Sequence, residues 1–386
     1  MSPLDTGALG RPLRIAILGS RGVPARYGGF ETFVHELAPM LAKAGVETTV
    51  FCEAPERGEI TSPRWNGVRL TYVSAKGPGP LGTLAYDLRC LWKARRDFDV
   101  VYMLGYGAAF ACGIPRLFGT KVWINMDGLE WRRSKWGWLA RTWLKWNEGR
   151  ACRSADRLIF DSKALQREVA LRRSLPATDV VAYGTHRPQR LDAKRKLLEL
   201  GLKSGRFMLA VCRFEPENQV VELVRARLAS RTHMPLILVS NLRPGPGEDE
   251  VRNAPSDAVR CLGAVYDAET LEVLRTHCAA YLHGHTVGGT NPSLLEAMGA
   301  GAYCIAHDNP FNRETLANAG SYFASSRDLA SQIDRLVGMT EEAAQYGRQA
   351  QARVAQHYTW EGIADSYLRM LNATTASDSD QVRQAG

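Results

Sequence analysis

The sequence predicts an α/β fold with two doubly wound, Rossmann-like domains that face a central cleft. Short apolar runs alternate with amphipathic stretches of helical periodicity, which is the pattern of a parallel sheet covered by helices. This alternation breaks at the polar, basic residues 186–205 and then starts again. A chain of 386 residues, 45% of them hydrophobic, is long enough for two separate cores.

The first half of the chain is predicted to form a domain over residues 1–190. The amphipathic stretch 31–45 predicts a helix that ends at Gly45. The expected strands are 13–19, 47–53, 69–75, 99–105, 121–127, 156–162 and 179–185. Residues 191–205 are expected to form a linker that contains a short helix.

A second domain is predicted over residues 206–356. Its expected strands are 207–214, 236–241, 259–265, 279–285 and 303–308. Thr359 is a good N-cap for a C-terminal helix over 357–372, which we expect to pack back on the first domain. The polar residues 373–386 are predicted to form a disordered tail.

Composition and charge narrow the class of protein. The net charge of +9 favours anionic partners, namely phosphorylated substrates, anionic lipid or nucleic acid. No apolar run approaches the roughly 18 residues of a membrane-spanning helix. Residues 1–14 lack the apolar core of a signal peptide, and the eight Cys form no CxxC pair. We therefore expect a cytoplasmic protein with reduced thiols.

We expect no metal ion and no other cofactor. His283 and His285 have the spacing of two metal ligands, but no third ligand follows nearby. The sequence "DFD" at 97–99 matches a metal–nucleotide motif, but it precedes a strand. It therefore lies at the amino end of that strand, whereas ligands of doubly wound sheets bind beyond the carboxyl ends.

The loop after the first strand, "GSRGVPARYGG", is a candidate ligand contact. Gly28 and Gly29 precede the helix 31–45, and glycine lets a ligand approach the backbone closely. The glycine spacing does not fit the dinucleotide fingerprint GxGxxG. A loop whose glycines serve only its turns is the alternative.

Two acidic residues follow the strand 121–127. Asp127 is our candidate catalytic residue, as a hydrogen-bond acceptor or base, and Glu130 lies close behind it. An Asp-Gly turn or a helix cap explains Asp127 equally well.

The stretch "GGTNPSLLEAMGAG" combines a glycine pair with a capped helix. Asn291 suits the N-cap and Pro292 the first helical position. The backbone amides of Ser293 and Leu294 are then expected to point outward and bind an anion. Glu296, an acid within an apolar run, is suited to ribose hydroxyls; a capped helix with a solvated Glu is the alternative.

Arg213 follows the first strand of the second domain. An arginine at this position is suited to form a bidentate clamp on a diphosphate. The alternative is a surface arginine paired with Glu215 or Glu217.

Five of the nine Trp lie between residues 131 and 146. Trp136, Leu139, Trp143 and Trp146 are spaced to fall on one helical face. Near basic residues, such a face is typical of a membrane-surface helix, but also of a stripe packed on the core. The sequence leaves both interpretations open.

Together these motifs resemble family-4 glycosyltransferases of the GT-B fold. They are most similar to the bacterial rhamnosyltransferase subgroup with the DUF1972-type N-terminal domain, over about residues 13–372. The motifs that carry the resemblance are "GSRGVPARYGGFETFVHEL", "NMDGLEW" with the following Arg and "KW", "CRFEPEN" and "GGTNPSLLEAM".

The resemblance implies a retaining, metal-independent transferase that uses a nucleotide-diphosphate sugar. The sugar implied is rhamnose from dTDP-rhamnose, and the acceptor a lipid-linked saccharide at the anionic inner face of the cytoplasmic membrane, in cell-surface polysaccharide synthesis. No nucleic acid partner is implied. UDP- or GDP-linked donors, a GT-B-fold nucleotide-sugar epimerase and a non-catalytic binding module remain alternatives.

The resemblance also assigns residues. Gly28 and Gly29 match the glycine pair near the reaction centre, and Asp127 stands where many members have a histidine. Gly288 replaces the first Glu of the family's E-x7-E motif, and Asn218 replaces its diphosphate-binding Lys. The donor-binding candidates are Arg213, Asn218, Gly289, Thr290, Asn291, Ser293, Leu294 and Glu296.

Overall fold

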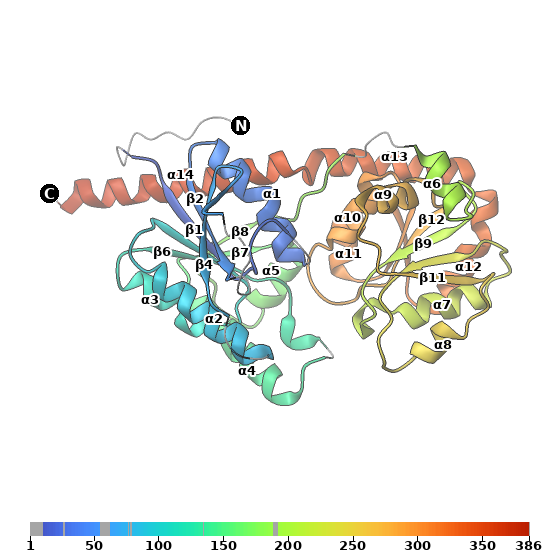
Figure 1. Ribbon diagram of the computed structural model, residues 1–386, viewed down its shortest axis with the longest axis horizontal. Helices are drawn as coiled ribbons and strands as arrows, with labels where there is room; N and C mark the ends of the chain where they lie inside the picture. Colours follow the sequence, from blue (N-terminus) through green and yellow to red (C-terminus); the bar gives the residue numbers. More distant parts are fainter. Residues whose placement is uncertain are drawn as a thin grey trace. The chain divides into compact units, whose positions relative to one another are not determined.

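The chain folds into two compact units, each built on its own sheet (Figure 1). The computed structural model describes residues 11–25, 28–54, 62–75, 77, 79–133, 135–187 and 192–385. Unit 1 comprises Met1–Tyr183 and Trp360–Gly386, and unit 2 comprises Gly184–Thr359. The first crossing, between residues 183 and 184, precedes the expected end of the first domain at 190, and the second, between 359 and 360, follows the expected end of the second domain at 356.

The residues expected to form a linker belong to unit 2. Helix α6 (Ala193–Glu199) is capped by Asp192 and packs against α9 (Ala268–His277). Lys196 of α6 forms an ion pair of 3.0 Å with Asp267. Residues 188–191, at the end of the expected first domain and the start of the expected linker, lie outside the described residues.

The sheet of unit 1 has the order β3-β4-β2-β1-β5-β6-β7-β8. Its pairings are parallel except for β3 with β4. The strands are β1 (Arg14–Leu18), β2 (Glu47–Glu53), β3 (Arg64–Trp65), β4 (Val68–Val73), β5 (Val100–Leu104), β6 (Lys121–Asn125), β7 (Arg157–Phe160) and β8 (Ala177–Val180). Every strand expected in this half overlaps an observed strand, although the expected strand 179–185 shares only residues 179 and 180 with β8, and β3 is additional.

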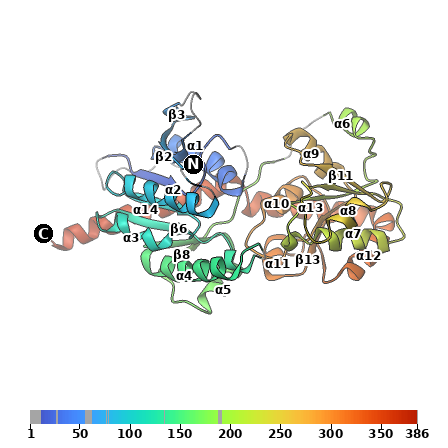
Figure 2. The same ribbon diagram turned by 60° about the horizontal axis from the view of Figure 1, so that its bottom comes forward.

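Helices cover both faces of this sheet. They are α1 (Gly29–Lys43), α2 (Gly79–Lys93), α3 (Gly113–Arg116), α4 (Trp138–Ser154), α5 (Lys163–Ala170) and α14 (Trp360–Ala385), with short 3-10 turns η1 (Ala109–Ala111) and η2 (Glu130–Arg132). The crossovers after β1 and β4 run in opposite directions along the sheet, so right-handed connections place α1 and α2 on opposite faces. Helices α2 and α3 pack together (Figure 2). The 3-10 turn η1 packs against both α3 and α4.

The C-terminal helix α14 packs on α1 of unit 1 (Figure 1). Tyr367 of α14 lies 5.8 Å from Phe33, ring centroid to ring centroid, and its hydroxyl is 2.7 Å from that of Tyr102. Both contacts are buried, so they fix this helix to the sheet. The helix continues to Ala385, so residues 373–385, expected to be disordered, are helical here.

The sheet of unit 2 has the order β11-β10-β9-β12-β13-β14 and is parallel throughout. Its strands are β9 (Met208–Val211), β10 (Leu236–Val239), β11 (Val259–Gly263), β12 (Ala280–His283), β13 (Cys304–His307) and β14 (Gly320–Phe323). The sequence analysis missed β14, whose residues "GSYF" hold no apolar run.

The helices of unit 2 form two layers. Besides α6 and α9 they are α7 (Val220–Ala229), α8 (Glu248–Arg252), α10 (Pro292–Gly299), α11 (Pro310–Leu316), α12 (Ser326–Arg335) and α13 (Thr340–His357), with 3-10 turns η3 (Pro216–Asn218) and η4 (Leu336–Gly338). Helices α7 and α12 pack together, while α10 contacts both α9 and α13 (Figure 1). The apolar core between α7, α12 and the sheet is fully buried.

Each sheet reverses its strand order once. The reversal lies between β1 and β5 in unit 1 and between β9 and β12 in unit 2. Loops that leave the carboxyl ends of such strands diverge and open a crevice where ligands bind. Among the described residues, no helix has the length and apolarity needed to cross a bilayer.

Candidate functional site

The N-terminus of α10 is anchored at the strand reversal of unit 2. The Ser293 hydroxyl donates to the carbonyl of Val211, the last residue of β9, over 2.8 Å. The buried Tyr281 hydroxyl lies 2.5 Å from Ser293 Oγ, to which it can donate, and 3.2 Å from the same carbonyl. These bonds hold the start of α10 against the carboxyl end of β9, two residues before Arg213.

Arg213 is exposed at this position. Its side chain makes no hydrogen bond or ion pair within the described part of the chain, so the alternative pairing with Glu215 or Glu217 is not observed. The backbone of Arg213 is nevertheless fixed, because its carbonyl accepts from the Glu215 amide and from Asn218 Nδ2, each over 2.8 Å. A cation on a fixed turn is available for an anionic ligand.

Asn218 has protein partners at both ends of its buried amide group. Its Nδ2 donates to the Arg213 carbonyl, and its Oδ1 accepts from His285 Nδ1 over 2.7 Å. Asn218 therefore ties the Arg213 turn to the residue that follows β12. Both polar ends of this side chain therefore have protein partners, and a contact of Asn218 with a donor phosphate stays a prediction.

The backbone approaches closely at Gly284, a residue that the sequence analysis did not select. A Cβ on Gly284 would meet the Asn218 carbonyl at 2.3 Å, so only glycine fits. The Thr286 amide donates to the Glu217 carbonyl over 2.9 Å. The segment after β12 is thus held against η3. In the sequence, a glycine directly after an apolar strand was the signal that could have indicated this close approach.

The structure confirms the predicted cap of α10 but corrects the expectation of free amides. Asn291 is the N-cap and its Oδ1 accepts from the Ser293 amide over 2.9 Å, with Pro292 at the first helical position. The Leu294 amide donates to the Asn291 carbonyl over 3.1 Å. The N-cap therefore uses the same backbone amides that would otherwise bind an anion. The attraction of α10 for an anion then rests on the positive end of its helix dipole.

Gly288, which stands where the resemblance implies the first Glu of E-x7-E, has a backbone conformation that favours glycine. Gly288 has a φ of 118°, in the region that residues with a side chain rarely adopt. A Glu here would require a different loop conformation. Thr290 is buried, and Gly289 remains half-buried.

Glu296 forms an ion pair with Arg275 of α9. The Arg275 side chain is 7% exposed and that of Glu296 is 39% exposed, so the acid reaches solvent and the base does not. Arg275 was not predictable, because no sequence pattern links a helix residue to a partner 21 positions later.

The glycine pair of unit 1 serves two purposes. Gly28 has a φ of 124°, and a Cβ there would clash with the Glu31 carboxylate, whose Oε1 accepts from the Arg21 amide over 2.8 Å. A Cβ on Gly29 would meet no atom within 4 Å. Gly28 is therefore required by the backbone, while Gly29 leaves open space at the start of α1.

Asp127 follows β6 and is half-buried. Its amide donates to Asn125 Oδ1 over 2.8 Å, and the Tyr183 hydroxyl donates to its carboxylate over 3.4 Å. Burial, with smaller contributions from the negative charges of Glu130 and Asp161, raises the pKa of Asp127 to about 8. A carboxyl group with a pKa near the working pH is suited to exchange a proton with a ligand hydroxyl.

Glu130 pairs directly with Arg133, whose positive charge also opposes the rise in the pKa of Asp127. The distance from Arg133 Nε to Glu130 Oε1 is 2.8 Å. The buried Tyr106 hydroxyl accepts from the Glu130 amide over 2.9 Å and donates to the Gly128 carbonyl over 3.2 Å. Tyr106, which follows β5, therefore holds the loop that carries both acids; the sequence analysis did not select it.

The tryptophan-rich segment lies on the surface of unit 1. Its exposed fractions are 74% for Trp138, 66% for Leu139, 40% for Trp143 and 48% for Trp146. Trp143 and Trp146 lie 5.3 Å apart, centroid to centroid, and both rings contact Phe110. The structure therefore does not place this stripe in the core. Trp136, which the spacing put on the same helical face, precedes α4.

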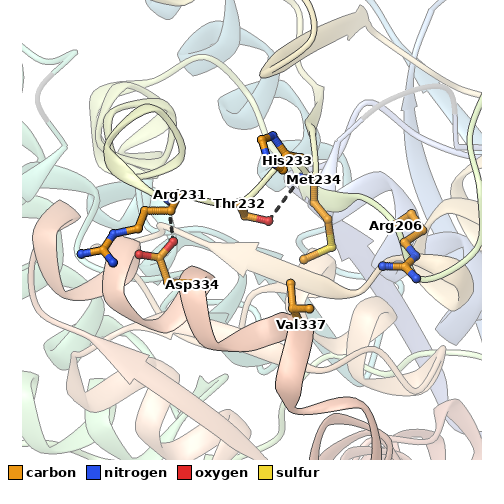
Figure 3. A pocket seen from close by; sticks show the side chains of 7 residues that line it. All are labelled: Arg206, Arg231, Thr232, His233, Met234, Asp334 and Val337. Atoms are coloured by element: carbon orange, nitrogen blue, oxygen red, sulfur yellow. Dashed lines mark hydrogen bonds between the residues drawn. The ribbon is translucent and has the colours of Figure 1, made fainter.

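A pocket of about 530 Å³ lies in unit 2 at the end of the sheet opposite to Arg213 (Figure 3). Arg206 precedes β9 and Met234 precedes β10, so the pocket opens at the amino ends of these strands. Figure 3 shows the guanidinium groups of Arg206 and Arg231 on opposite sides of it, without a common focus. The pocket is thus separate from the residues around Arg213.

Two further observations concern metal ions. Within the described ranges, no group of three or more His, Cys, Asp or Glu side chains is arranged to hold one. Asp99 of the "DFD" sequence lies at the amino end of β5, where the Arg11 side chain and the Arg14 amide bind its carboxylate.

Two family models match the chain, one in each half. Residues 13–186 match a domain of unknown function, DUF1972, and residues 220–369 match a domain described as glycosyl transferase-like. No curated protein matches the sequence. The two matches support the resemblance to this class but do not single out rhamnosyltransferases.

Solved structures with the same fold cover nearly the whole chain. Sucrose-phosphate synthase from Thermosynechococcus elongatus has a TM-score of 0.79 and 19% identity, over 95% of this chain and 100% of its own. Anabaena HepE, solved with UDP-glucose, has a TM-score of 0.74 and 17% identity, over 93% and 99%. A glycosyltransferase from Rickettsia africae has a TM-score of 0.69 and 11% identity, over 94% and 98%.

The fold of these proteins is GT-B, the two-sheet fold expected from the sequence. The glycosyl transferase-like domain and this fold together identify the chain as a glycosyltransferase. Which sugar it transfers, and to which acceptor, depends on the residues of its own sites.

Proposed function

We propose that the chain transfers a sugar from a nucleoside-diphosphate donor, bound at the strand reversal of unit 2, to a hydroxyl group of a lipid-linked saccharide. Transfer retains the anomeric configuration and needs no metal ion. The observation that carries this proposal is Arg213, an exposed cation with no ion pair among the described residues, on a turn fixed beside the start of α10.

The leaving group of such a reaction is a nucleoside diphosphate, which gains negative charge as the sugar leaves. Arg213 and the positive end of the α10 dipole stabilise that charge. Glu296 accepts a hydrogen bond from the pentose of the nucleotide, at the 3′ hydroxyl and, in a ribonucleotide, also at the 2′ hydroxyl. Asp127 of unit 1 orients a hydroxyl group of the acceptor, for which its raised pKa suits it.

Rhamnose from dTDP-rhamnose is our first choice of donor. A 6-deoxy sugar has one hydroxyl fewer to bind, and Gly288 provides no side chain where related enzymes have a Glu. Three of the similar structures were solved with UDP, UDP with glucose or UDP-glucose, so UDP-linked sugars are the main alternative.

A donor screen separates these choices. Binding of dTDP-, UDP- and GDP-linked sugars is measured by calorimetry, and turnover is followed with a polyprenyl-diphosphate-linked saccharide. We expect dTDP-rhamnose to bind best and EDTA to leave turnover unchanged. Preference for a UDP- or GDP-sugar would reject rhamnose, and loss of turnover in EDTA, restored by a divalent ion, would reject the metal-free reaction.

The exposed tryptophans of α4 suit a membrane-bound acceptor. Trp138, Trp143 and Trp146 are accompanied by exposed Arg141 and Lys145 on the same helix. Indole rings insert at the interface of a bilayer, and basic side chains bind anionic headgroups. We therefore propose that α4 holds unit 1 at the inner face of the cytoplasmic membrane.

Replacing Trp143 and Trp146 by Ser should weaken binding to vesicles that contain phosphatidylglycerol at least about tenfold. The reason is that the variant loses the favourable transfer of two indole rings from water into the bilayer. Vesicle co-sedimentation measures this effect. Leu198→Ser is the matched control, since Leu198 is 79% exposed on α6 of unit 2. Equal binding of both variants and the wild type would show that α4 does not touch the membrane.

A further inference from the structure

A charged pair of a buried arginine and a partly exposed glutamate connects α9 and α10 in unit 2. Arg275 lies in the last turn of α9, where its side chain is 7% exposed, and its Nη2 contacts Glu296 Oε2. The two helices pack against each other (Figure 1). The pair therefore joins two elements on one face of the sheet.

Arg275 has a single carboxylate partner among the described residues. Glu272 lies one turn earlier on the same helix, yet its Oε1 is buried without a hydrogen bond, as is Arg275 Nε. Burial raises the pKa of Glu272, while the charge of Arg275 opposes the rise. Thus Glu272 does not compete with Glu296 for a hydrogen bond from the guanidinium.

The contact leaves the other oxygen of Glu296 available. Oε2 receives the hydrogen bond, whereas Oε1 has no partner within the described residues and the side chain is 39% exposed. A free glutamate side chain samples several rotamers, and fixing it costs free energy when a ligand binds. A buried arginine that already holds one oxygen removes much of this cost.

We propose that Arg275 is a positioning residue, which holds the Glu296 carboxylate in the orientation that accepts hydrogen bonds from the pentose hydroxyl groups of the nucleotide. These are the 2′ and 3′ hydroxyls in a UDP-linked donor and the 3′ hydroxyl in a dTDP-linked donor. This inference rests on the donor site proposed above. It extends that site to a residue of α9 that does not contact the nucleotide. Removing Arg275 should therefore weaken recognition of the hydroxyl groups and leave the contacts to base and diphosphate intact.

The test compares nucleotides with and without those hydroxyl groups. Calorimetry gives the affinities of UDP and dTDP, each against its 2′,3′-dideoxy counterpart, for the wild type and for Arg275→Gln, Arg275→Lys, Glu296→Gln and Glu272→Gln. We expect the wild type to prefer the natural nucleotide about tenfold or more, as for a hydrogen bond to a charged group.

The expected pattern among the variants is specific. Glu296→Gln and Arg275→Gln should reduce that preference to about threefold or less, with affinity for the dideoxy nucleotides within about threefold of the wild type. Arg275→Lys should retain part of the preference, because its ammonium keeps the charge but not the planar fork. Glu272→Gln is the control inside the same cluster and should keep the full preference.

The two proposals fail in different ways. Intact preference in both Arg275 variants, with preference lost in Glu296→Gln, would overturn the positioning role and leave the donor site standing. Equal loss of affinity for natural and dideoxy nucleotides in both Arg275 variants would also overturn it, since Arg275 would then act on folding alone. A wild type without any preference would reject the ribose contact of Glu296 itself.

Discussion

Replacing Arg213 by Ala should lower kcat/KM for sugar transfer by about 100-fold or more, which is typical for the loss of one charged group that stabilises a transition state. The guanidinium is exposed and has no protein partner among the described residues, so its removal breaks no ion pair. The turn that carries it is held by backbone and Asn218 contacts, which the substitution leaves in place. Thermal unfolding should therefore stay close to that of the wild type.

Arg206 provides a matched control for this substitution. It is also an exposed arginine without an ion pair in the described part of the chain, but it precedes β9, whereas Arg213 follows it. Arg206→Ala should leave kcat/KM within about threefold of the wild type, as surface changes away from a site usually do. If the two variants lose activity equally, net charge and not the position of Arg213 explains the effect.

Arg213→Lys distinguishes a point charge from a bidentate clamp. Lysine keeps the charge but cannot present two parallel donors to a diphosphate. We expect its kcat/KM to lie between those of the wild type and Arg213→Ala. A Lys variant as active as the wild type would mean that charge alone is required.

Local pattern was sufficient to predict most of the sheet strands. The run 47–53 coincides with β2, and most other runs match their strands to within about three residues, because buried parallel strands are short and apolar. The run 179–185 overlaps β8 at two residues only. The strands that were not predicted lack that signal. β14 is one, and β3 forms a two-residue hairpin arm beside Asn66 and Gly67, whose positive φ values of 45° and 82° mark a tight turn. The Asn-Gly pair was the signal available for β3.

The candidate site was predictable in position but not in its internal contacts. Arg213 and the cap residue Asn291 follow strands, so pattern alone located them. The partners of Asn218 and Glu296, namely His285 and Arg275, lie 67 and 21 positions away in the chain. Contacts at such separations depend on the order of the strands and on the packing of the helices. The local pattern of a single sequence does not reveal either.

Asp127→Asn should reduce kcat/KM about 100-fold, which is typical of a lost acid–base group, and should remove a pH dependence. Because burial raises the pKa of Asp127 to about 8, most molecules hold a proton there at neutral pH. If the ionised carboxylate accepts the hydrogen bond of the acceptor hydroxyl, kcat/KM of the wild type rises with pH through about 8. The variant should show no such rise.

The same substitution tests the cause of the raised pKa through stability. An unfolded Asp titrates near about 3.9, so between about pH 4 and 8 the folded chain keeps a proton that the unfolded chain has released. The stability contributed by the protonated carboxyl is therefore complete below about pH 4 and lost as pH rises to about 8. Asn does not titrate, yet it still accepts from the Tyr183 hydroxyl.

Relative to Asp127→Asn, the wild type should thus lose unfolding free energy on the order of a few kcal/mol between about pH 4 and pH 9. Urea denaturation at several pH values measures this difference. Subtracting the curve of the variant removes the pH dependence that all other titrating groups contribute, including Asp87, whose pKa burial raises to about 7. Parallel curves for the two proteins would mean that Asp127 titrates normally. The rise of kcat/KM near pH 8 would then belong to another group, and Asp127 would not be the acid–base residue.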